Sequence, residues 1–223
     1  ECNFSDHGAN RLGASALMQG LSDGYFVIPY TMQNYLSDQI QVKLPSTDAP
    51  EFVEAEKGVQ AEIDRIMDIQ NKQTDKSKLM SVDSIHRELY KIMWNYVGMA
   101  RNEAGLKKAL EMLKAVRQQF DTCVRVPGSK EGLNVELDKA IHLRDFILMG
   151  ELIAYDALER NESCGGHFRE ESQTEEGEAK RDDEHYMYVA CWQYQGSDDV
   201  APTLLKEDLN YQYIKVQTRN YKS

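Results

Sequence analysis

The feature that most constrains the fold is a succession of long amphipathic segments between residues 51 and 160. In each segment, apolar residues recur every three or four positions, which is the period of a helix with one buried face. The segments are joined by short connections with turn residues, such as the run Pro127-Gly-Ser-Lys130. Short connections make consecutive helices antiparallel, so the sequence predicts an antiparallel bundle of three to four helices.

We expect these helices at residues 51–73, after the N-cap candidates of residues 81–84, at 105–123 and at 135–160. The last helix carries apolar residues on two sides and is predicted to be the most buried. The predicted buried stripes are Val59, Ile63, Ile66 and Met67; then Ile85, Leu89, Ile92, Met93, Tyr96 and Ala100; then Leu106, Leu110, Leu113 and Phe120; and in the last helix Leu137, Ile141, Leu148, Leu152 and Tyr155, with Ala140, Ile147, Gly150 and Ala154 on its second side.

The regions on either side of the bundle have a different character. Residues 13–36 are predicted to be helical, with Pro29 kinking or ending the first part, and residues 44–50 form a turn-rich connector. After Asn161 the chain becomes acidic and polar, and residues 185–194 and 204–216 are rich enough in aromatic and β-branched residues to be strands. The predicted fold class is therefore mainly α, with a small β-containing C-terminal subdomain.

Composition excludes several partner classes. The net charge of −11 argues against nucleic acid and against direct adhesion to an anionic membrane. No apolar run reaches the roughly 18 residues of a spanning helix. The four cysteines lie far apart without a CxxC pair, so they indicate reduced thiols and neither an iron–sulfur nor a zinc site within this chain.

The first seventeen residues carry the chemistry of an anion receptor. Gly8 and Gly13 let the backbone approach a ligand closely. The Gly-Ala-Ser-Ala run after Leu12 opens a helix whose unpaired N–H groups favour negative charge. Arg11 offers a planar fork that matches a carboxylate or phosphate. This span therefore indicates a site for a large anionic ligand.

The same residues resemble the flavoprotein subunit of succinate dehydrogenase and fumarate reductase. In that family a Gly-Glu pair precedes the motif His-Gly-x-Asn-Arg-Leu-Gly, and Asn-Ser-Leu usually follows. Here Glu1 matches the Glu, residues 7–13 match the motif, and Ser15-Ala16-Leu17 replace Asn-Ser-Leu. The family's C-terminal region is also similar to this chain at residues 86–89, 99–102, 160–169 and 181–183, although many members have Arg in place of Cys164 and Ala in place of Gly166.

The resemblance implies site residues and a cofactor. Arg11 would hold a carboxylate of the dicarboxylate substrate, succinate or fumarate. Glu1 would bind the ribose of FAD, and the backbone N–H groups of Ala16 and Leu17 would approach the flavin. His7 either borders the substrate or positions the loop. No catalytic residue and no metal ligand are assigned within the chain.

The resemblance also implies how the chain is organised. The family's Gly-x-Gly-x-x-Gly flavin fingerprint and its capping domain are not present in this sequence. We therefore expect the C-terminal piece of a longer flavoprotein, inactive and without FAD when alone. Residues 1–45 would be the tail of the FAD-binding domain, residues 46–160 the helical bundle and residues 161–223 the C-terminal subdomain.

Partners and location follow from the same resemblance. The parent protein would exchange electrons with an iron–sulfur subunit, which docks on a membrane anchor. It would then lie in the cytoplasm, peripheral to the inner face of the bacterial inner membrane. Two alternatives stay open. A related flavoenzyme such as L-aspartate oxidase shares much of the Arg11 motif and needs no membrane complex. A non-catalytic helical interaction module explains the bundle but leaves the motif without a purpose.

Overall fold

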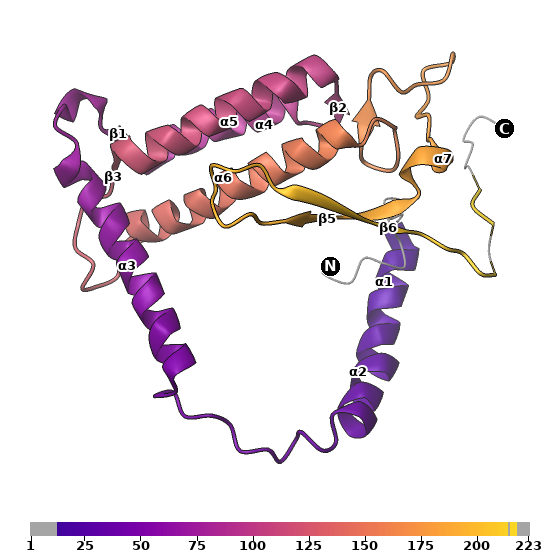
Figure 1. Cartoon of the computed structure of the whole chain (residues 1–223), viewed down its shortest axis with the longest axis horizontal. Helices are drawn as coiled ribbons and strands as arrows, with labels where there is room; N and C mark the ends of the chain where they lie inside the picture. The colour runs from indigo at the N-terminus through magenta and orange to yellow at the C-terminus, as the bar shows by residue number, and fades with distance from the viewer. Residues whose placement is uncertain (1–12, 214, 218–223) are drawn as a thin grey trace.

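The chain forms a helical bundle with one long helical arm and a β-hairpin attached to it (Figure 1). The computed structural model describes residues 13–213 and 215–217. The bundle consists of α3 (Pro50–Lys72), α4 (Val82–Tyr96), α5 (Glu103–Cys123) and α6 (Val135–Glu159). The predicted mainly helical class and its antiparallel bundle are confirmed.

Two short parallel ladders set the helix directions. β1 (Met80–Ser81), just before α4, pairs with β3 (Val124–Arg125), just after α5. The start of α4 therefore lies beside the end of α5, and the two helices run antiparallel. At the other end of the bundle, β2 (Ala100–Arg101) pairs with β4 (Phe168–Arg169), which follows α6. α6 packs against both α4 and α5, and the C-terminal half of α3 crosses the end of the bundle (Figure 1).

Three of the bundle helices, α4, α5 and α6, begin where a side-chain cap satisfies one of their first N–H groups. Ser81 Oγ accepts a hydrogen bond from the Ser84 N–H at 3.2 Å, which confirms a predicted cap. Asn102 Oδ1 accepts from the Gly105 N–H at 2.7 Å, and Asn134 Oδ1 accepts from the Leu137 N–H at 3.1 Å. Such a cap contributes about 1 kcal/mol to helix stability.

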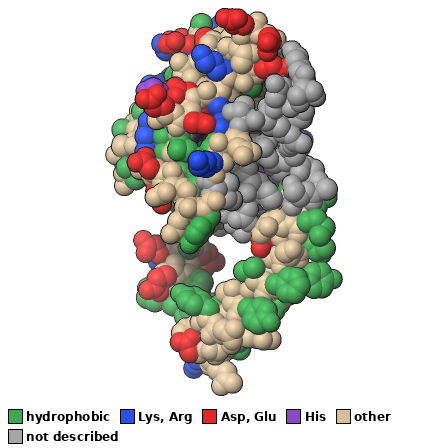
Figure 2. Space-filling model, turned by 90° about the vertical axis from the view of Figure 1, so that its right-hand side faces the viewer, with side chains coloured by type: hydrophobic (Ala, Val, Ile, Leu, Met, Phe, Trp, Pro, Cys, Tyr) green, Lys and Arg blue, Asp and Glu red, His purple; other side chains and the backbone are tan. Residues whose placement is uncertain are grey.

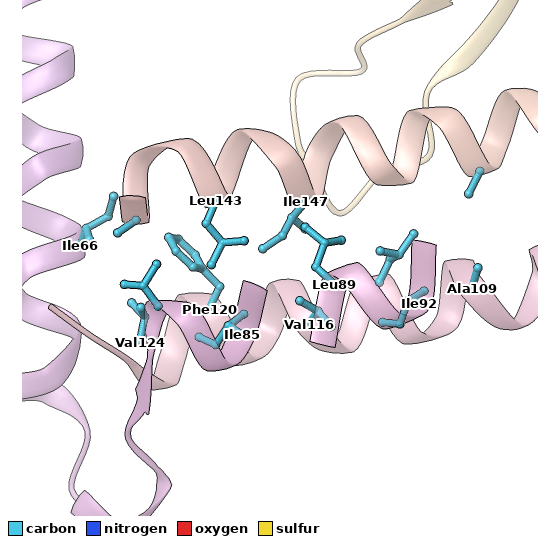
Figure 3. Packing of buried hydrophobic residues seen from close by; sticks show 14 of the residues in the cluster. Ile66, Ile85, Leu89, Ile92, Ala109, Val116, Phe120, Val124, Leu143 and Ile147 are labelled. Carbon is cyan, nitrogen blue, oxygen red and sulfur yellow. The ribbon is translucent and has the colours of Figure 1, made fainter. Parts of the chain in front are cut away.

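A single apolar core holds the bundle together (Figure 3). Leu113 is fully buried, Phe120 is 1% exposed, and both lie on α5 between α4 and α6. Gly150 lets the helices approach, because a Cβ there would lie 3.1 Å from Met93 Sδ and 3.6 Å from a Leu113 methyl group. The other fully buried large apolar residues are Ile66, Ile85, Leu106, Leu143, Ile147, Val82, Val124 and Val126.

Three predicted core positions are wrong. Val59 is 62% exposed because the N-terminal half of α3 extends beyond the bundle (Figure 1). Ala100 is exposed because α4 ends at Tyr96, and the chain turns into β2. On α6 the buried side is that of Ala140, Ile147, Gly150 and Ala154, whereas Leu148 on the other predicted side is exposed.

The N-terminal arm, residues 13–49, projects away from the bundle (Figure 1). It contains α1 (Gly13–Ser22), a π-helical turn (Asp23–Val27), α2 (Ile28–Tyr30) and a second π-helical turn (Thr31–Tyr35), followed by turns up to α3. Pro29 does not end the helical stretch: the residues on both sides of it stay helical, and the turns before and after α2 widen to π geometry.

The C-terminal subdomain contains α7 (Asp183–Tyr186) and an antiparallel hairpin of β5 (Tyr188–Gln193) and β6 (Thr203–Asp208). Both predicted strands are confirmed, although the second ends at Asp208. The hairpin lies along α6 (Figure 1), where Trp192 Nε1 donates to Asp156 at 2.9 Å and Lys206 pairs with Glu159 at 2.9 Å. Within the described residues, no helix is long and apolar enough to cross a membrane.

Candidate functional site

The anion-receptor motif leads into the start of α1. Glu1, His7 and Arg11, three residues of the predicted site, lie outside the described residues. α1 begins at Gly13, so the N–H groups of residues 13–15, in its first turn, have no partner within the helix. The helix therefore starts directly after the motif, as predicted, and presents its positive dipole end there.

Ala16 and Leu17, the predicted flavin neighbours, differ in their surroundings. The Ala16 side chain is buried, with 9% exposed, whereas Leu17 is 69% exposed. Both residues follow the three N–H groups that start α1, so their own N–H groups lie within the hydrogen-bonded part of the helix.

The arm exposes an unusual amount of apolar surface (Figure 2). Leu17, Leu21, Tyr25 and Phe26, which the sequence predicts as its apolar side, are all more than half exposed. A patch of this kind on a single protein marks an interaction surface. The further exposed large apolar residues of the arm are Met18, Val27, Ile28, Tyr30, Met32, Tyr35, Leu36, Ile40, Val42 and Leu44.

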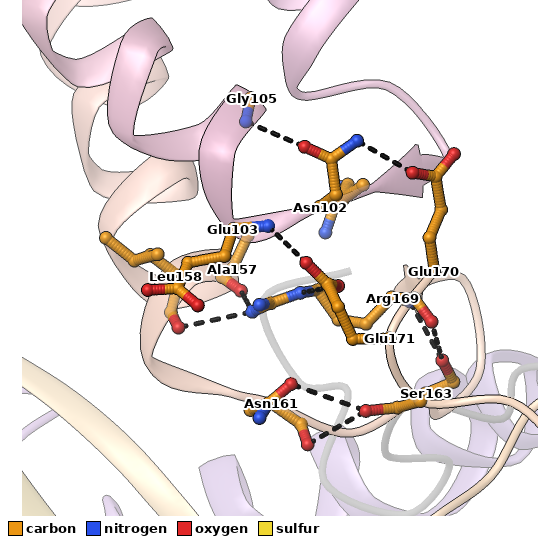
Figure 4. A network of polar contacts seen from close by, with 12 residues as sticks. Asn102, Glu103, Gly105, Ala157, Leu158, Asn161, Ser163, Arg169, Glu170 and Glu171 are labelled. Carbon is orange, nitrogen blue, oxygen red and sulfur yellow. Dashed lines mark hydrogen bonds and ion pairs between the residues drawn. The ribbon is translucent and has the colours of Figure 1, made fainter.

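The segment that carries the second part of the resemblance, residues 160–171, fastens the end of the bundle, and we call it the clasp (Figure 4). Arg169 is only 2% exposed. Its guanidinium donates to the carbonyls of Ala157 and Leu158, at 2.9 and 3.2 Å, and pairs with Glu171 at 3.1 Å. A buried cation thus satisfies the last carbonyls of α6, where the helix dipole is negative.

The clasp also caps α5 (Figure 4). Glu171 accepts a hydrogen bond from the Glu103 N–H at 2.6 Å, at the positive end of α5. Glu170 accepts from the side chain of Asn102, the N-cap residue, at 2.7 Å. Burial opposes ionisation of Glu171, but its hydrogen bonds with the Glu103 N–H and Arg169 outweigh burial and lower its pKa. One short segment therefore closes two helix ends.

His167 connects the clasp to the end of α4. Arg101, on β2, donates to His167 Nδ1 at 2.7 Å, and His167 Nε2 lies 2.7 Å from the Arg160 carbonyl. A guanidinium only donates and a carbonyl only accepts, so both contacts require a neutral imidazole with its proton on Nε2. Burial is the largest cause that lowers the pKa of His167, and the charges of Arg101, Arg169 and Arg160 lower it further, which together outweigh the opposite effect of the hydrogen bond to the Arg160 carbonyl.

Arg160 and Glu162 join the clasp to the C-terminal subdomain. Arg160 pairs with Glu162 at 2.9 Å and donates to the carbonyls of Tyr186 and Tyr188, at 2.9 and 3.2 Å. Glu162, 3% exposed, also accepts from the Asp182 N–H at 2.8 Å. The clasp thus holds the bundle and the hairpin in one unit.

Cys164 and His167 enclose a tight turn. Their backbones exchange two hydrogen bonds, at 2.9 and 3.1 Å, around Gly165, which has a φ of 61°. Among the residues that the structure describes, no group of three or more His, Cys, Asp or Glu side chains could hold a metal ion.

A cleft of about 540 Å³ lies between α3, α5, α6 and the hairpin loop. Three arginines line it, and each one is paired: Arg65 with Glu62 and Asp121, Arg144 with Glu62 and Asp145, and Arg117 with Glu151 and Asp199. Ion pairs therefore occupy the guanidinium groups of this cleft, and the cleft offers no free receptor for an anionic substrate.

Sequence reasoning noted the clasp only as a resemblance and missed what it does. Its charged residues are typical of a surface loop. They are buried because the start of α5 and the end of α6, more than fifty residues apart in sequence, meet around them. The signal available was the concentration of Arg, Glu and Asn at the ends of the predicted helices, where helix capping needs such residues.

The comparisons with known proteins agree with the fold. Residues 86–221 match the family model described as fumarate reductase flavoprotein C-term. The chain is 32% identical over 167 residues, 74% of its length, to an uncharacterised FAD-dependent oxidoreductase of Methanocaldococcus jannaschii. It is 27% identical over 188 residues, 84% of its length, to the fumarate reductase flavoprotein subunit of Haemophilus influenzae. It is 25% identical over 162 residues, 73% of its length, to the L-aspartate oxidase of Acinetobacter baylyi.

A solved structure shares the fold. The structure of Mycobacterium smegmatis Sdh1 in complex with UQ1 superposes with a TM-score of 0.61 at 22% identity, over 78% of this chain and 27% of that one. The chain spans about a quarter of the length of the curated relatives that it matches, 26% for the M. jannaschii protein and 28% for the H. influenzae subunit. Most of α4, the helices α5 and α6, the clasp and the hairpin lie within the matched residues 86–221. This chain therefore belongs to the family of fumarate reductase and succinate dehydrogenase flavoproteins, as its C-terminal region.

Proposed function

We propose that the protein to which this chain belongs is an FAD-dependent oxidoreductase that interconverts succinate and fumarate. The observation that carries this proposal is the family match over residues 86–221, taken together with the His-Gly-Ala-Asn-Arg motif directly before α1. The bundle and clasp by themselves hold no arrangement for redox chemistry in the described residues, so the chemistry is assigned to the N-terminal end.

The residues at that end fit an anionic cofactor. α1 starts with small residues, its first-turn N–H groups at residues 13–15 have no partner within the helix, and the Ala16 side chain is buried. The N–H groups of Ala16 and Leu17 would hold the flavin edge and Glu1 the ribose. When bound, FAD supplies the acceptor for a hydride from the substrate. Arg11 would hold a substrate carboxylate and orient the C–C bond that reacts.

Partners and location form the next part of the proposal. Electrons would pass between the flavin and an iron–sulfur subunit, and a membrane anchor would bind that subunit. The flavoprotein would then lie in the cytoplasm, peripheral on the inner face of the bacterial inner membrane. The support is the similarity in fold to Sdh1, whose solved structure contains the ligand UQ1.

A second candidate function, L-aspartate oxidase, is favoured by a specific observation. Aspartate oxidases match this chain at 25% and 27% identity, in the range of the fumarate reductase subunit at 27%. The two functions separate in a substrate assay, because only one oxidises an amino dicarboxylate. Reduction of the bound flavin by L-aspartate, and not by succinate, would establish this candidate.

The test of the proposal is Arg11→Lys in the protein that carries its flavin domain. An ammonium cannot reproduce the bidentate geometry of a guanidinium on a carboxylate. Loss of about 1.5–3 kcal/mol of charge-assisted binding corresponds to a fall of about 10–100-fold in kcat/KM for succinate. Arg125→Lys, at an exposed position on β3, is the matched control. FAD content should be equal in all three proteins, and an unchanged kcat/KM for Arg11→Lys would remove Arg11 from the site.

The 223-residue chain alone is a further test. Only one edge of the proposed cofactor site lies in this sequence, so we expect the purified chain to retain no FAD and to be inactive with succinate. A flavin absorbance band that succinate bleaches would contradict this division of the protein.

A further inference from the structure

The end of α4 and the clasp meet at an imidazole that can hold them together only when it is neutral. His167 accepts from Arg101 through Nδ1 and donates to the Arg160 carbonyl through Nε2, both at 2.7 Å. Because a guanidinium cannot accept and a carbonyl cannot donate, no other protonation state satisfies both contacts. A second proton would have to be placed on Nδ1, facing the Arg101 guanidinium.

Three arginines disfavour a charged imidazole at His167: Arg101 on β2, Arg160 after α6 and Arg169 on β4. Arg160 and Arg169 each have a carboxylate partner, Glu162 and Glu171, and Asp156 lies close enough to Arg101 to act on its pKa. Arg101 has no carboxylate partner within ion-pair distance in the described residues, since its other hydrogen bonds go to the carbonyls of Val97 and Gly98. Protonation would therefore break the hydrogen bond from Arg101 and place a second cation directly beside its guanidinium.

The contact crosses a short joint. β2 and β4 pair over only two residues, Ala100 with Phe168 and Arg101 with Arg169. The Glu170 N–H donates to the Arg101 carbonyl at 2.8 Å across the same joint, and Glu170 and Glu171 accept hydrogen bonds from Asn102 and the Glu103 N–H beside it. The His167 contact holds the Arg101 side of this joint, next to the hydrogen bond of the Glu170 amide.

We propose that His167 is a proton-sensitive latch that fastens the clasp to the end of α4 at neutral pH and releases it in mild acid. The latch is independent of the proposed redox function, because none of its residues belongs to the site at the start of α1.

The pH window follows from the direction of the pKa change. Folding lowers the pKa of His167 below 6.5, so the unfolded or released state binds more protons. The latch is therefore fully closed above about pH 6.5 and is lost as the pH falls from there through the folded-state pKa. His185 behaves in the opposite way, because its hydrogen bond to Asp182 raises its pKa.

A pH titration of the full chain by NMR tests the latch without a variant. The imidazole nitrogen shifts of His167 should report the Nε2–H tautomer at about pH 7.5 and a pKa below that of His185. The protection of the Glu170 amide against hydrogen exchange should fall as the pH drops from about 6.5 through the folded-state pKa of His167. The fall should be up to about tenfold for each unit by which folding lowers that pKa. The Leu113 amide inside the bundle is the reference and should show no such change.

Two variants complete the test. In His167→Gln a neutral amide replaces the imidazole, so Glu170 protection should no longer depend on pH between about 5 and 7.5. His185→Gln, the matched control, should keep the wild-type response. A His167 pKa at or above that of His185, an Nδ1–H tautomer, or an unchanged pH response of Glu170 in His167→Gln would each overturn the latch.

Discussion

The bundle and the N-terminal arm are both helical and both rich in apolar residues, yet they differ completely in burial. On α5, Leu113 is fully buried and Phe120 is 1% exposed. On the arm, Leu17 is 69% exposed, Tyr25 70% and Phe26 64%. The bundle therefore obtains its stability from contacts within the described chain, whereas the arm leaves its apolar surface available to another molecule or another part of the protein.

The sequence pattern explains this difference. In the bundle, apolar residues return every three or four positions and form one stripe. In the arm, residues 25–28 are Tyr-Phe-Val-Ile, four consecutive large apolar side chains that point in all directions around a helix. A helix that is apolar on all sides is usually buried on all sides. Helical propensity and apolar content alone therefore do not locate a core. The period of the apolar residues is also needed, because it shows whether one face of a helix or all of its sides can be buried.

The largest effect expected from this comparison is that of matched truncations. Leu113→Ala should lower the free energy of unfolding by about 2–5 kcal/mol, because it leaves a cavity between three helices. Phe26→Ala removes a larger side chain but should change the stability of the 223-residue chain by less than about 0.5 kcal/mol, because that ring is already exposed. Urea denaturation followed by circular dichroism measures both.

The same pair sharpens the proposal for the arm. In a protein that carries the proposed flavin domain, we expect the arm to pack against that domain. Phe26→Ala should then lower the free energy of unfolding by more than it does in the 223-residue chain. Equal and small effects of Phe26→Ala in both settings would show that the arm does not pack there. A large effect in the 223-residue chain would contradict the arrangement of Figure 1.

The clasp should give the next largest effect. Arg169→Met keeps most of the side-chain volume but removes a buried cation that satisfies the last carbonyls of α6, and we expect a loss of about 2–4 kcal/mol. Arg181→Met is the control, because Arg181 pairs with Asp183 with 24% of its side chain exposed, and should cost less than about 1 kcal/mol. Equal losses in the two variants would mean that the clasp is no more than a surface loop.

Much of this fold could be predicted from the sequence for a physical reason. The stripes of α4 and α5 have the helical period, and caps such as Ser81 act within three residues. Both signals are local, so the sequence displays them directly. The errors at Val59 and Leu148 have the opposite cause, because local periodicity shows which face is apolar but not whether a neighbouring element reaches it.

The candidate site was less predictable. The motif around Arg11 has a chemistry that its residues display, whereas the latch at His167 needs Arg101, which lies 66 positions away in the sequence. No local pattern indicates that such a histidine is held between a guanidinium and a carbonyl. Contacts of this kind arise from the topology, here the pairing of β2 with β4.

The smallest effect concerns two glycines that distinguish a packed helix from a free one. Gly58, on the part of α3 beyond the bundle, has nothing within 4 Å of an added Cβ, whereas a Cβ at Gly150 would lie 3.1 Å from Met93 Sδ. Gly58→Ala should therefore stabilise the chain by about 0.5–1 kcal/mol, the gain in helix propensity. Gly150→Ala has the same gain, but Met93 must shift to accommodate the methyl group, so the net change should be smaller than at Gly58. Thermal unfolding of the two variants measures the difference.

An equal gain at both positions would show that α4 and α6 are not in close contact at Gly150. The close packing that distinguishes the bundle from the arm would then be absent at this position.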